Sequence, residues 1–346
     1  GVVAAPGGGG PQAWMGLLGD RTTFSAEVVA QLEALRRVVE AEEGERAAMD
    51  ALPVQRVAAL RAQLVSAGVD GFLIPRADEQ QGEYVPKRSE RLNWLTGFTG
   101  SAGVAVVLRD KAAIFVDGRY TLQVGSEVDT ETFAVRHLVE QPVPQWLSEN
   151  LKPGQVLGFD PWLHTRGDVR RLTQALRKVN ATLKPLHNLV DAVWKGQPAA
   201  PLAPVEAQPE AFAGKTSAAK RAEVAKLLVD DGVDALVISA PDVVAWLLNI
   251  RGADVPYTPL PLGFAILHRG GEVDVFMDAR KLVPGLAQAL GDGVKVGAPE
   301  AFGAALRALG DAKKTVQMDE LTGAMWIYEQ LSQSGAQVRV AVDPCM

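Results

Sequence analysis

An internal repeat constrains the fold of this chain more than any other feature of its sequence. Residues 60–78 read LRAQLVSAGVDGFLIPRAD, and residues 224–242 read VAKLLVDDGVDALVISAPD, an offset of 164 positions (224 − 60). At this offset Gly68, Val69 and Asp70 meet identical residues. The repeat predicts two tandem copies of one folding module.

The pattern inside each copy predicts an α/β module. In the first copy a helix over residues 54–67 ends at Gly68, where glycine is a favourable helix stop, and a buried strand over residues 69–75 follows. Two further apolar runs, residues 104–108 and 114–116, are typical of a hairpin. Helices that alternate with short strands predict a mixed sheet covered by helices.

A glycine-rich turn leads into that hairpin. Residues 94–103 read WLTGFTGSAG, and Gly97, Gly100 and Gly103 predict a tight structural turn in which backbone segments pass close to one another. The spacing differs from the dinucleotide-binding fingerprint, whose first gap is one residue and which opens a helix. Ser101 lacks the G-x-S-x-G spacing of a nucleophile elbow, so no catalytic serine is expected here.

Composition limits the class of protein. A length of 346 residues with 47% hydrophobic residues suits two ordinary domains. The net charge of −6 argues against a nucleic-acid partner, and no membrane span is expected because no stretch of about eighteen apolar residues lacks charges. Cys345 is the only cysteine, so no intrachain disulfide and no cysteine metal site are expected, and the cytoplasm is the predicted location.

These observations predict a division of the chain into segments. Residues 1–24 are expected to be a tag or a disordered leader, residues 25–50 an N-terminal helix, and residues 51–195 the first module. Prolines among alanines mark residues 196–216 as a linker, and the second module is expected over residues 217–346.

Aspartate and arginine recur together at the end of a strand. Asp117 and Arg119 in the first copy match Asp278 and Arg280 in the second. A catalytic pair would not need duplication, so these residues are expected to form a structural turn with a local ion pair. An alternative hypothesis keeps Asp117 and Asp160 as strand-end carboxylates that hold a metal in a hydrolase or nuclease.

Several blocks of sequence carry a family resemblance. They are Ile74, Pro75, Asp78, Glu83 and Tyr84, then Arg91 with WLTGFTGSAG, the strand end Asp117-Gly118-Arg119-Tyr120, the block from Asn188 to Trp194, and AWLLNIRGADV over residues 245–255. In order and spacing these blocks resemble the N-terminal part of the Xaa-Pro aminopeptidases (aminopeptidase P) in their long, three-domain form. The resemblance covers residues 52–346.

The resemblance implies a fold of two tandem creatinase N-terminal-like domains, which are ribonuclease H-like α/β domains with mixed sheets covered by helices. It also implies a third, pita-bread domain in which two divalent ions, manganese or zinc, activate the water that cleaves the peptide bond before proline. No residue of that metal site can be carried over to this chain. The catalytic domain is therefore expected to be absent, and the chain is expected to bind no metal and to be inactive alone.

The resemblance further implies what these domains contribute. Arg91, and with it Trp94 and Tyr84, are the candidate residues that reach a substrate, and the loop over residues 254–259 is expected to face the missing domain. The implied roles are association into a homodimer and gating of the cleft for peptides with proline in second position. An alternative is an inactive protein-binding module of the same architecture, because relatives in chromatin factors bind proteins such as histones through acidic surfaces.

Overall fold

The computed structural model describes Arg36 and residues 52–345, and the described residues from Pro53 onward belong to one compact unit. The expected leader over residues 1–24 and the expected helix over residues 25–50 lie outside the described residues, apart from Arg36. Within the described part of the chain, no helix has the length and apolarity needed to cross a bilayer.

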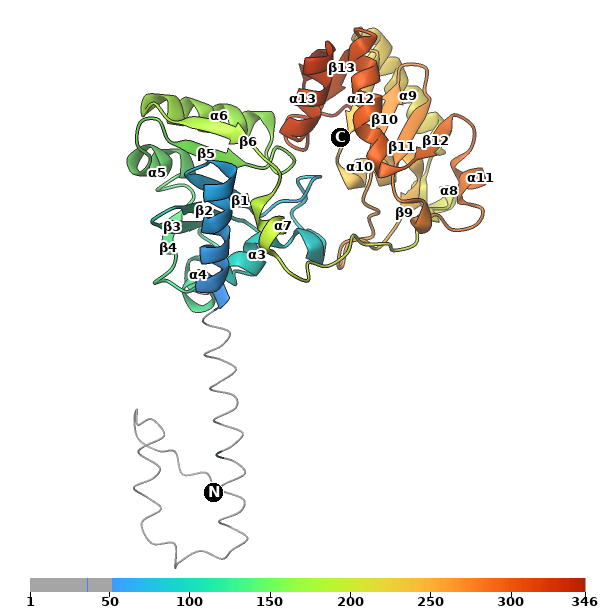
Figure 1. The fold of residues 1–346 in the computed structure, drawn as a ribbon. Coiled ribbons are helices and arrows are strands. Elements are labelled where there is room, and N and C mark those ends of the chain that lie inside the picture. Colours follow the sequence, from blue (N-terminus) through green and yellow to red (C-terminus); the bar gives the residue numbers. More distant parts are fainter. Residues whose placement is uncertain (1–35, 37–51, 346) are drawn as a thin grey trace, which may run out of the picture. The chain divides into compact units, whose positions relative to one another are not determined.

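The first module is a six-stranded mixed sheet with helices on both faces (Figure 1). The strand order is β4-β3-β2-β1-β5-β6, and β2 alone runs antiparallel to its neighbours. Its elements are a helix over residues 52–67, β1 (Gly71–Pro75), the 3-10 helix η1 (Lys87–Ser89), α3 (Arg91–Thr96), β2 (Gly103–Leu108), β3 (Ala112–Val116), α4 (Thr121–Glu127), β4 (Ala134–His137), α5 (Val143–Asn150), β5 (Val156–Phe159), α6 (Arg166–Lys178), β6 (Thr182–Pro185) and α7 (Leu189–Val193).

The second module repeats this topology strand for strand. Its sheet order is β12-β11-β10-β8-β13-β14, and β10 takes the antiparallel position of β2. Its elements are β7 (Glu206–Ala207), α8 (Glu210–Ala213), α9 (Ser217–Asp230), β8 (Ala235–Ile238), α10 (Pro241–Leu248), β9 (Ile250–Arg251), β10 (Phe264–His268), β11 (Val273–Phe276), η2 (Ala279–Lys281), α11 (Leu286–Leu290), β12 (Val294–Gly297), η3 (Pro299–Ala301), α12 (Phe302–Asp311), β13 (Thr315–Met318), α13 (Met325–Ser334) and β14 (Gln337–Val340). The predicted α/β fold of two tandem modules is confirmed.

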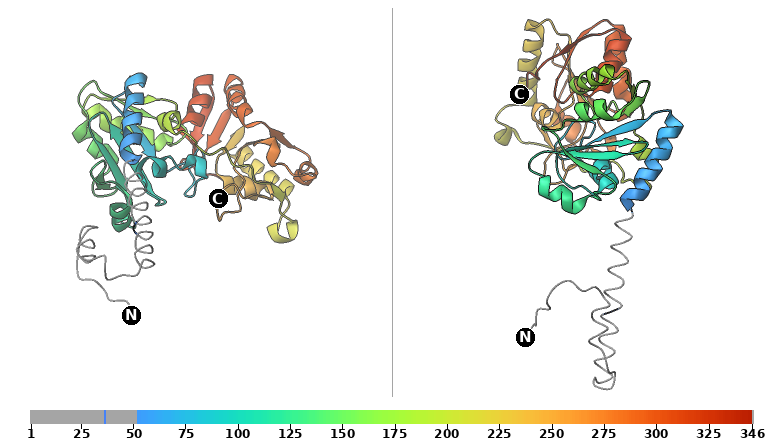
Figure 2. Two further views of the ribbon diagram at one scale, coloured as in Figure 1. Left: turned by 60° about the horizontal axis from the view of Figure 1, so that its bottom comes forward. Right: turned by 90° about the vertical axis from the view of Figure 1, so that its left-hand side faces the viewer.

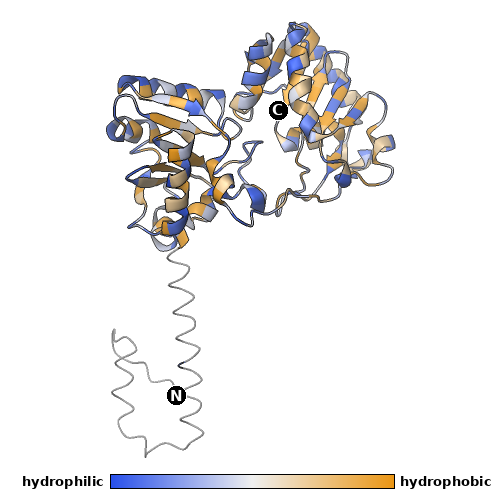
Figure 3. Cartoon of the chain, viewed as in Figure 1, coloured by the Kyte–Doolittle hydropathy of each residue, from blue (hydrophilic) through white to orange (hydrophobic). Residues whose placement is uncertain are grey.

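Both faces of each sheet are buried under helices. In β1, Phe72 and Ile74 pack with the helix of residues 52–67 on one face, while Leu73 packs with α5 and α6 on the other. Figure 2 shows the helix of residues 52–67 along one side of the sheet. Alternate residues of a strand point to opposite faces, so a strand covered on both sides must be apolar throughout. Figure 3 shows this as apolar colour along the central strands of both sheets.

The expected linker over residues 196–216 is partly built into the second module. Val205 is fully buried in the core that α9 and α10 cover, and β7 pairs with β9. Burial of one apolar side chain and two backbone pairings order this stretch despite its prolines.

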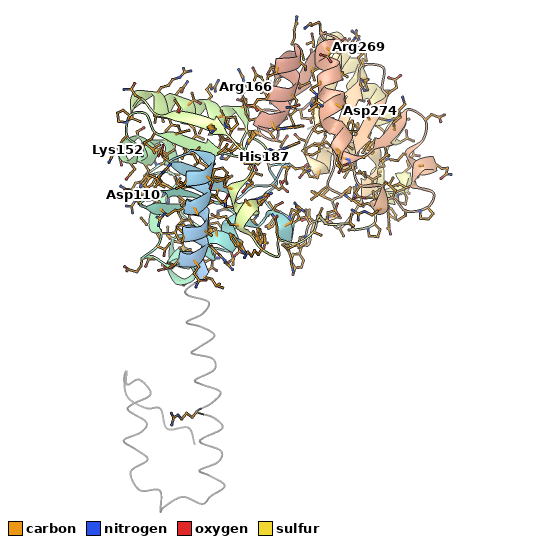
Figure 4. All side chains as sticks on the ribbon, in the orientation of Figure 1. Asp110, Lys152, Arg166, His187, Arg269 and Asp274 are labelled. Atoms are coloured by element: carbon orange, nitrogen blue, oxygen red, sulfur yellow. The ribbon has the colours of Figure 1, made fainter. Side chains whose placement is uncertain are left out.

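In each six-stranded sheet, an aspartate just before the first strand in chain order (β1 or β8) binds the fifth (β5 or β13). Asp70 Oδ2 accepts a hydrogen bond of 2.8 Å from the first amide of β5, and Asp70 Oδ1 lies 3.1 Å from Arg109 Nε. In the second module, Asp234 Oδ2 accepts a hydrogen bond of 2.9 Å from the first amide of β13. Asp234 Oδ1 lies 3.3 Å from Nη1 of Arg269, which Figure 4 labels. The identity of Asp70 and Asp234 in the repeat therefore has a structural reason.

We expect Asp70→Ala and Asp234→Ala each to lower the free energy of unfolding of its own module by about 1–2 kcal/mol, because each leaves a strand amide without its acceptor. The two sites share no partner, so the losses should add in the double variant. Urea unfolding followed by circular dichroism measures this, with Asp311→Ala, an exposed position at the end of α12, as the control. Equal stability of all three variants would contradict the assignment.

Candidate functional site

The sequence candidates gather at one edge of the first sheet. All its strands except β2 end at this edge, and β2 begins there. The loop after β1, the glycine-rich turn and the ends of β3 and β5 therefore lie along the same edge. Open α/β sheets commonly bind ligands outside the carboxyl ends of their strands, so this edge is the candidate site.

Close packing requires glycine in the turn before β2. Gly97 ends α3 at φ +83°, and a Cβ there would lie 2.9 Å from the backbone oxygen of Glu127. At Gly100 a Cβ would lie 2.2 Å from the ring of Phe98, while Gly103 begins β2. A side chain at Gly97 or Gly100 would collide with backbone or with a fully buried ring.

The exposed part of the edge carries four side chains in contact, of which three are joined by hydrogen bonds. Ser101 Oγ lies 2.8 Å from Tyr120 Oη and donates to Glu83 Oε1 at 3.2 Å. Arg119 Nη1 lies 3.9 Å from the same Glu83 oxygen, and its guanidinium lies 5.1 Å from the centre of the Tyr120 ring. Tyr84, next to Glu83 in sequence, is 59% exposed. This group offers donors, acceptors and an aromatic ring to a ligand.

The strand-end aspartates bond within the chain. Asp117 Oδ2 lies 2.8 Å from Arg119 Nη2, and Asp278 Oδ2 lies 2.7 Å from Arg280 Nη2. These side-chain bonds lower the pKa of both carboxyls, that of Asp278 to about 2. The local ion pair thus forms in both copies.

Asp160, at the end of β5, is buried and fully bonded. Its Oδ1 accepts from the amide of Trp162 at 2.9 Å and its Oδ2 from Asn188 Nδ2 at 3.0 Å. Among the described residues, no group of three or more histidine, cysteine, aspartate or glutamate side chains could hold a metal ion. The residues present therefore do not fit the two-metal site that the family resemblance implies, and no hydrolytic step is assigned to them.

Arg91 is buried, 2% exposed, and bonded within the chain. Its Nε lies 2.7 Å from Asp191 Oδ1, and its Nη2 lies 2.9 Å from Asp191 Oδ2 and 3.3 Å from Glu79 Oε1. Burial lowers the pKa of Arg91, and the bonds to Asp191 with the charge of Glu79 outweigh burial and raise it. A bidentate pair of this kind fixes geometry as well as charge. Arg91 therefore joins α3 to α7 and to the loop after β1, and its reach toward a substrate stays a prediction.

Trp94 lies against the core beneath the same edge. Its ring stacks on Trp194 with centres 5.4 Å apart and planes 18° apart, and the guanidinium of Arg56 lies 4.7 Å from its centre. The sequence by itself indicates no role for Asp191 or Trp194. The sequence signal that includes both residues is the block from Asn188 to Trp194, which resembles the family as a whole block.

Asp78 holds the loop that carries Tyr84. Its carboxyl is buried, and Oδ1 accepts from the amides of Gln80 at 3.1 Å and Gly82 at 2.9 Å, while Oδ2 has no partner among the described residues. Burial raises the pKa of Asp78 to about 6, although the bond from Gly82 lowers it. The loop is therefore held by a carboxyl that titrates near neutral pH.

The loop over residues 254–259 is anchored at its base. Asp254 is buried, accepts from the amides of Ala203 at 3.2 Å and Leu262 at 2.7 Å, and pairs with the buried Lys281. At its tip Tyr257 is fully exposed with φ +60°, a conformation that L residues seldom adopt. The anchor at the base presents one aromatic ring at the tip.

Two family models match this chain. Both are described as the creatinase/prolidase N-terminal domain, and they match residues 56–193 and 196–346. The chain belongs to the creatinase/prolidase N-terminal family. Each creatinase-like module corresponds to one match, and together the two matches cover both six-stranded sheets.

Two relatives of this creatinase-family chain are described as probable Xaa-Pro aminopeptidases P. The probable Xaa-Pro aminopeptidase P of Aspergillus clavatus is 36% identical over 265 residues, which are 75% of this chain and 40% of the relative. That of Paracoccidioides brasiliensis is 37% identical over 246 residues, 70% of this chain and 40% of the relative. The chain thus spans about two fifths of the length of the curated relatives it matches.

A solved structure agrees with the fold. The X-prolyl aminopeptidase from Caenorhabditis elegans, described as a cytosolic enzyme with a di-nuclear active site, superposes with a TM-score of 0.79 at 25% identity. The match covers 85% of this chain and 50% of that chain. Coverage of this extent includes both modules.

We expect Asp78→Asn to change how stability depends on pH. Because the pKa is raised in the folded state, this group stabilises the fold fully below about pH 4, and that contribution is lost as the pH rises through 6. Between pH 4 and pH 7 the wild type should therefore lose unfolding free energy on the order of 2–3 kcal/mol relative to the variant, which has no carboxyl to titrate here. Urea unfolding at a series of pH values measures this, with Asp311→Asn as the control, and parallel curves would contradict it.

We expect Gly97→Ala to cost more than Gly68→Ala. Both glycines have positive φ, but a Cβ at Gly68 meets nothing within 4 Å, whereas at Gly97 it meets a backbone oxygen at 2.9 Å. The expected losses of unfolding free energy are about 1 kcal/mol for Gly68→Ala and roughly 2–4 kcal/mol for Gly97→Ala. Thermal unfolding of the two variants compares them, and equal losses would show that the turn relaxes around a side chain.

Proposed function

We propose that residues 56–346 are the non-catalytic N-terminal part of an Xaa-Pro aminopeptidase, an enzyme that removes an N-terminal residue preceding proline. The observation that carries this proposal is the 36% identity to aminopeptidase P over 265 residues, together with two matches to one N-terminal domain family in tandem. The TM-score of 0.79 with the Caenorhabditis elegans enzyme supports it. We place the boundary between the domains at residues 195–196.

In this proposal the chemistry lies outside the described residues. Two divalent ions, manganese or zinc, would be held by another part of the enzyme and would activate the attacking water. The residues of this chain bind and orient the peptide. The enzyme would act in the cytoplasm, as its cytosolic relative does.

The first module would contribute Tyr84 to the wall of the substrate cleft. Tyr84 is exposed and follows Glu83, whose carboxylate accepts a hydrogen bond from Ser101, so the loop offers an aromatic ring and a polar group. Arg91 and Trp94 lie beneath it and act by holding α3 and the loop in place. Exposed tyrosines are frequent anchors of peptide contacts, because they bury a large area at low entropic cost.

The second module would contribute a docking loop. Tyr257 is fully exposed on a loop whose base is fixed by the buried pair of Asp254 and Lys281. A rigid loop with an exposed aromatic tip is suited to a protein contact. We propose that it faces the rest of the enzyme, and that the modules also support a homodimer.

The test measures hydrolysis of an Xaa-Pro peptide with added manganese or zinc. We expect no turnover by the 346-residue chain, and metal-dependent turnover by the longest polypeptide that the gene encodes. In that polypeptide Tyr84→Ala should raise KM several-fold with a smaller effect on kcat, whereas Leu122→Ala, a more exposed apolar position on α4, should change neither.

Two results would overturn the proposal. Turnover by the 346-residue chain would place catalysis within these residues. Retention of basic proteins such as histones by the chain at physiological salt, with no peptide hydrolysis by the longer polypeptide, would favour the inactive protein-binding module instead.

A further inference from the structure

The turn between the fifth strand and the following helix occurs in both modules at an offset of 159 residues (315 − 156). In the first module it runs from Asp160 to Thr165, the N-cap of α6, and in the second from Asp319 to Ala324, the N-cap of α13. Both turns begin with an aspartate whose carboxylate accepts a hydrogen bond of 2.9 Å from the amide two residues later in the chain. These are equivalent pieces of the duplicated fold.

The two equivalent turns pair with each other. Thr165 and Ala324 form an antiparallel bridge, so each N-cap residue faces its own counterpart. The amide of Met325 donates to His164 O at 2.7 Å, and the amide of Trp326 donates to Pro161 O at 2.9 Å. The pairing is pseudo-symmetric in that it joins a residue to its own counterpart, although the second module donates both of these hydrogen bonds.

One tryptophan of the first module anchors this pairing. Trp162 stacks on Trp326 with ring centres 4.0 Å apart and planes 17° apart, and it lies 5.6 Å from the ring of Phe264. Phe264 in turn stacks on Phe302 at 4.6 Å, so Trp162 ends a row of aromatic rings that belongs to the second module. Its counterpart Leu321 is 77% exposed, so only one of the two symmetric positions is used.

A cation–π contact borders the same pairing. The guanidinium of Arg166, labelled in Figure 4 at the start of α6, lies 4.8 Å from the ring centre of Tyr328 on α13. Such contacts over an aromatic face add to the attraction between the turns.

Trp162 also bonds to the loop that carries Tyr84. Gln81 Nε2 donates to Trp162 O at 2.9 Å and to Asp78 O at 3.3 Å. Gln81 itself adopts φ +59°, which the two side-chain bonds help to hold. The loop after β1 is thus fixed to the residue that contacts the second module.

We propose that Trp162 is the anchor of a pseudo-symmetric surface through which the two modules bind each other, and that it couples the second module to the loop over residues 78–84. The partner of the surface formed by Trp326, Phe264 and Phe302 is the first module of the same chain. The pairing of the two modules does not depend on the proposed function. Only the consequence for substrate contact by Tyr84 rests on that function.

The test is amide hydrogen exchange of the whole chain, read by mass spectrometry on peptides. Trp162→Ala should speed exchange at the amides of Met325 and Trp326 by at least tenfold, because both donate across the pairing. Leu321→Ala, the change at the equivalent turn position, should leave that exchange unchanged. Unchanged exchange at Met325 and Trp326 in Trp162→Ala would overturn the anchor.

A second variant approaches the same contact from the other module and leaves the sequence of the first module unchanged. Trp326→Ala should speed exchange of the amides in residues 78–84, which it does not touch. In unfolding midpoints, the double variant Trp162→Ala/Trp326→Ala should lose less than the two single losses combined. Unchanged exchange in residues 78–84, or additive losses, would overturn the coupling. Because no readout is peptide hydrolysis, these failures are distinct from failure of the proposed function.

Discussion

Burial of both faces of each six-stranded sheet is the constraint on which the rest of this structure depends. Strands such as β1, buried at all five positions, carry no polar side chain, so the polar groups of the candidate site lie at the strand ends. Burial of polar side chains at the strand ends removes them from water, which costs free energy. It raises the pKa of Asp78 and Asp160, and it requires Arg91 to lie against Asp191 and Glu79.

Duplication of this module separates what folding requires from what can diverge. Asp70 and Asp234 keep the same bonds to the fifth strand of each sheet, because the strand amide needs an acceptor in both. The turns that follow that strand differ, because Trp162 is half-buried and packs against the other module, whereas Leu321 is exposed. Duplication of the fold thus produces two equivalent turns, and the turn of the first module provides the ring that anchors their pairing, that of Trp162.

The first module combines rigid support with one exposed contact residue. Arg91 and Trp94 tie α3 to α7 and to the core, and the loop after β1 is fixed by Asp78, Glu79 and Gln81. A tyrosine displayed on such a loop loses little conformational entropy when a peptide binds. This is the physical basis on which a domain without catalytic residues contributes to the proposed peptidase.

Local sequence patterns determined the elements and their order. The glycine stop at Gly68 predicted a helix over residues 54–67, close to the helix of residues 52–67, because helix stops act over a few positions. The repeat in turn predicted two modules. Tertiary structure alone decided three things: the burial of Arg91 against Asp191, the ordering of Val205 in the predicted linker, and the stacking of Trp162 on Trp326. These join residues far apart in the chain, and no local pattern records which distant side chain fills a given space once the sheets have formed.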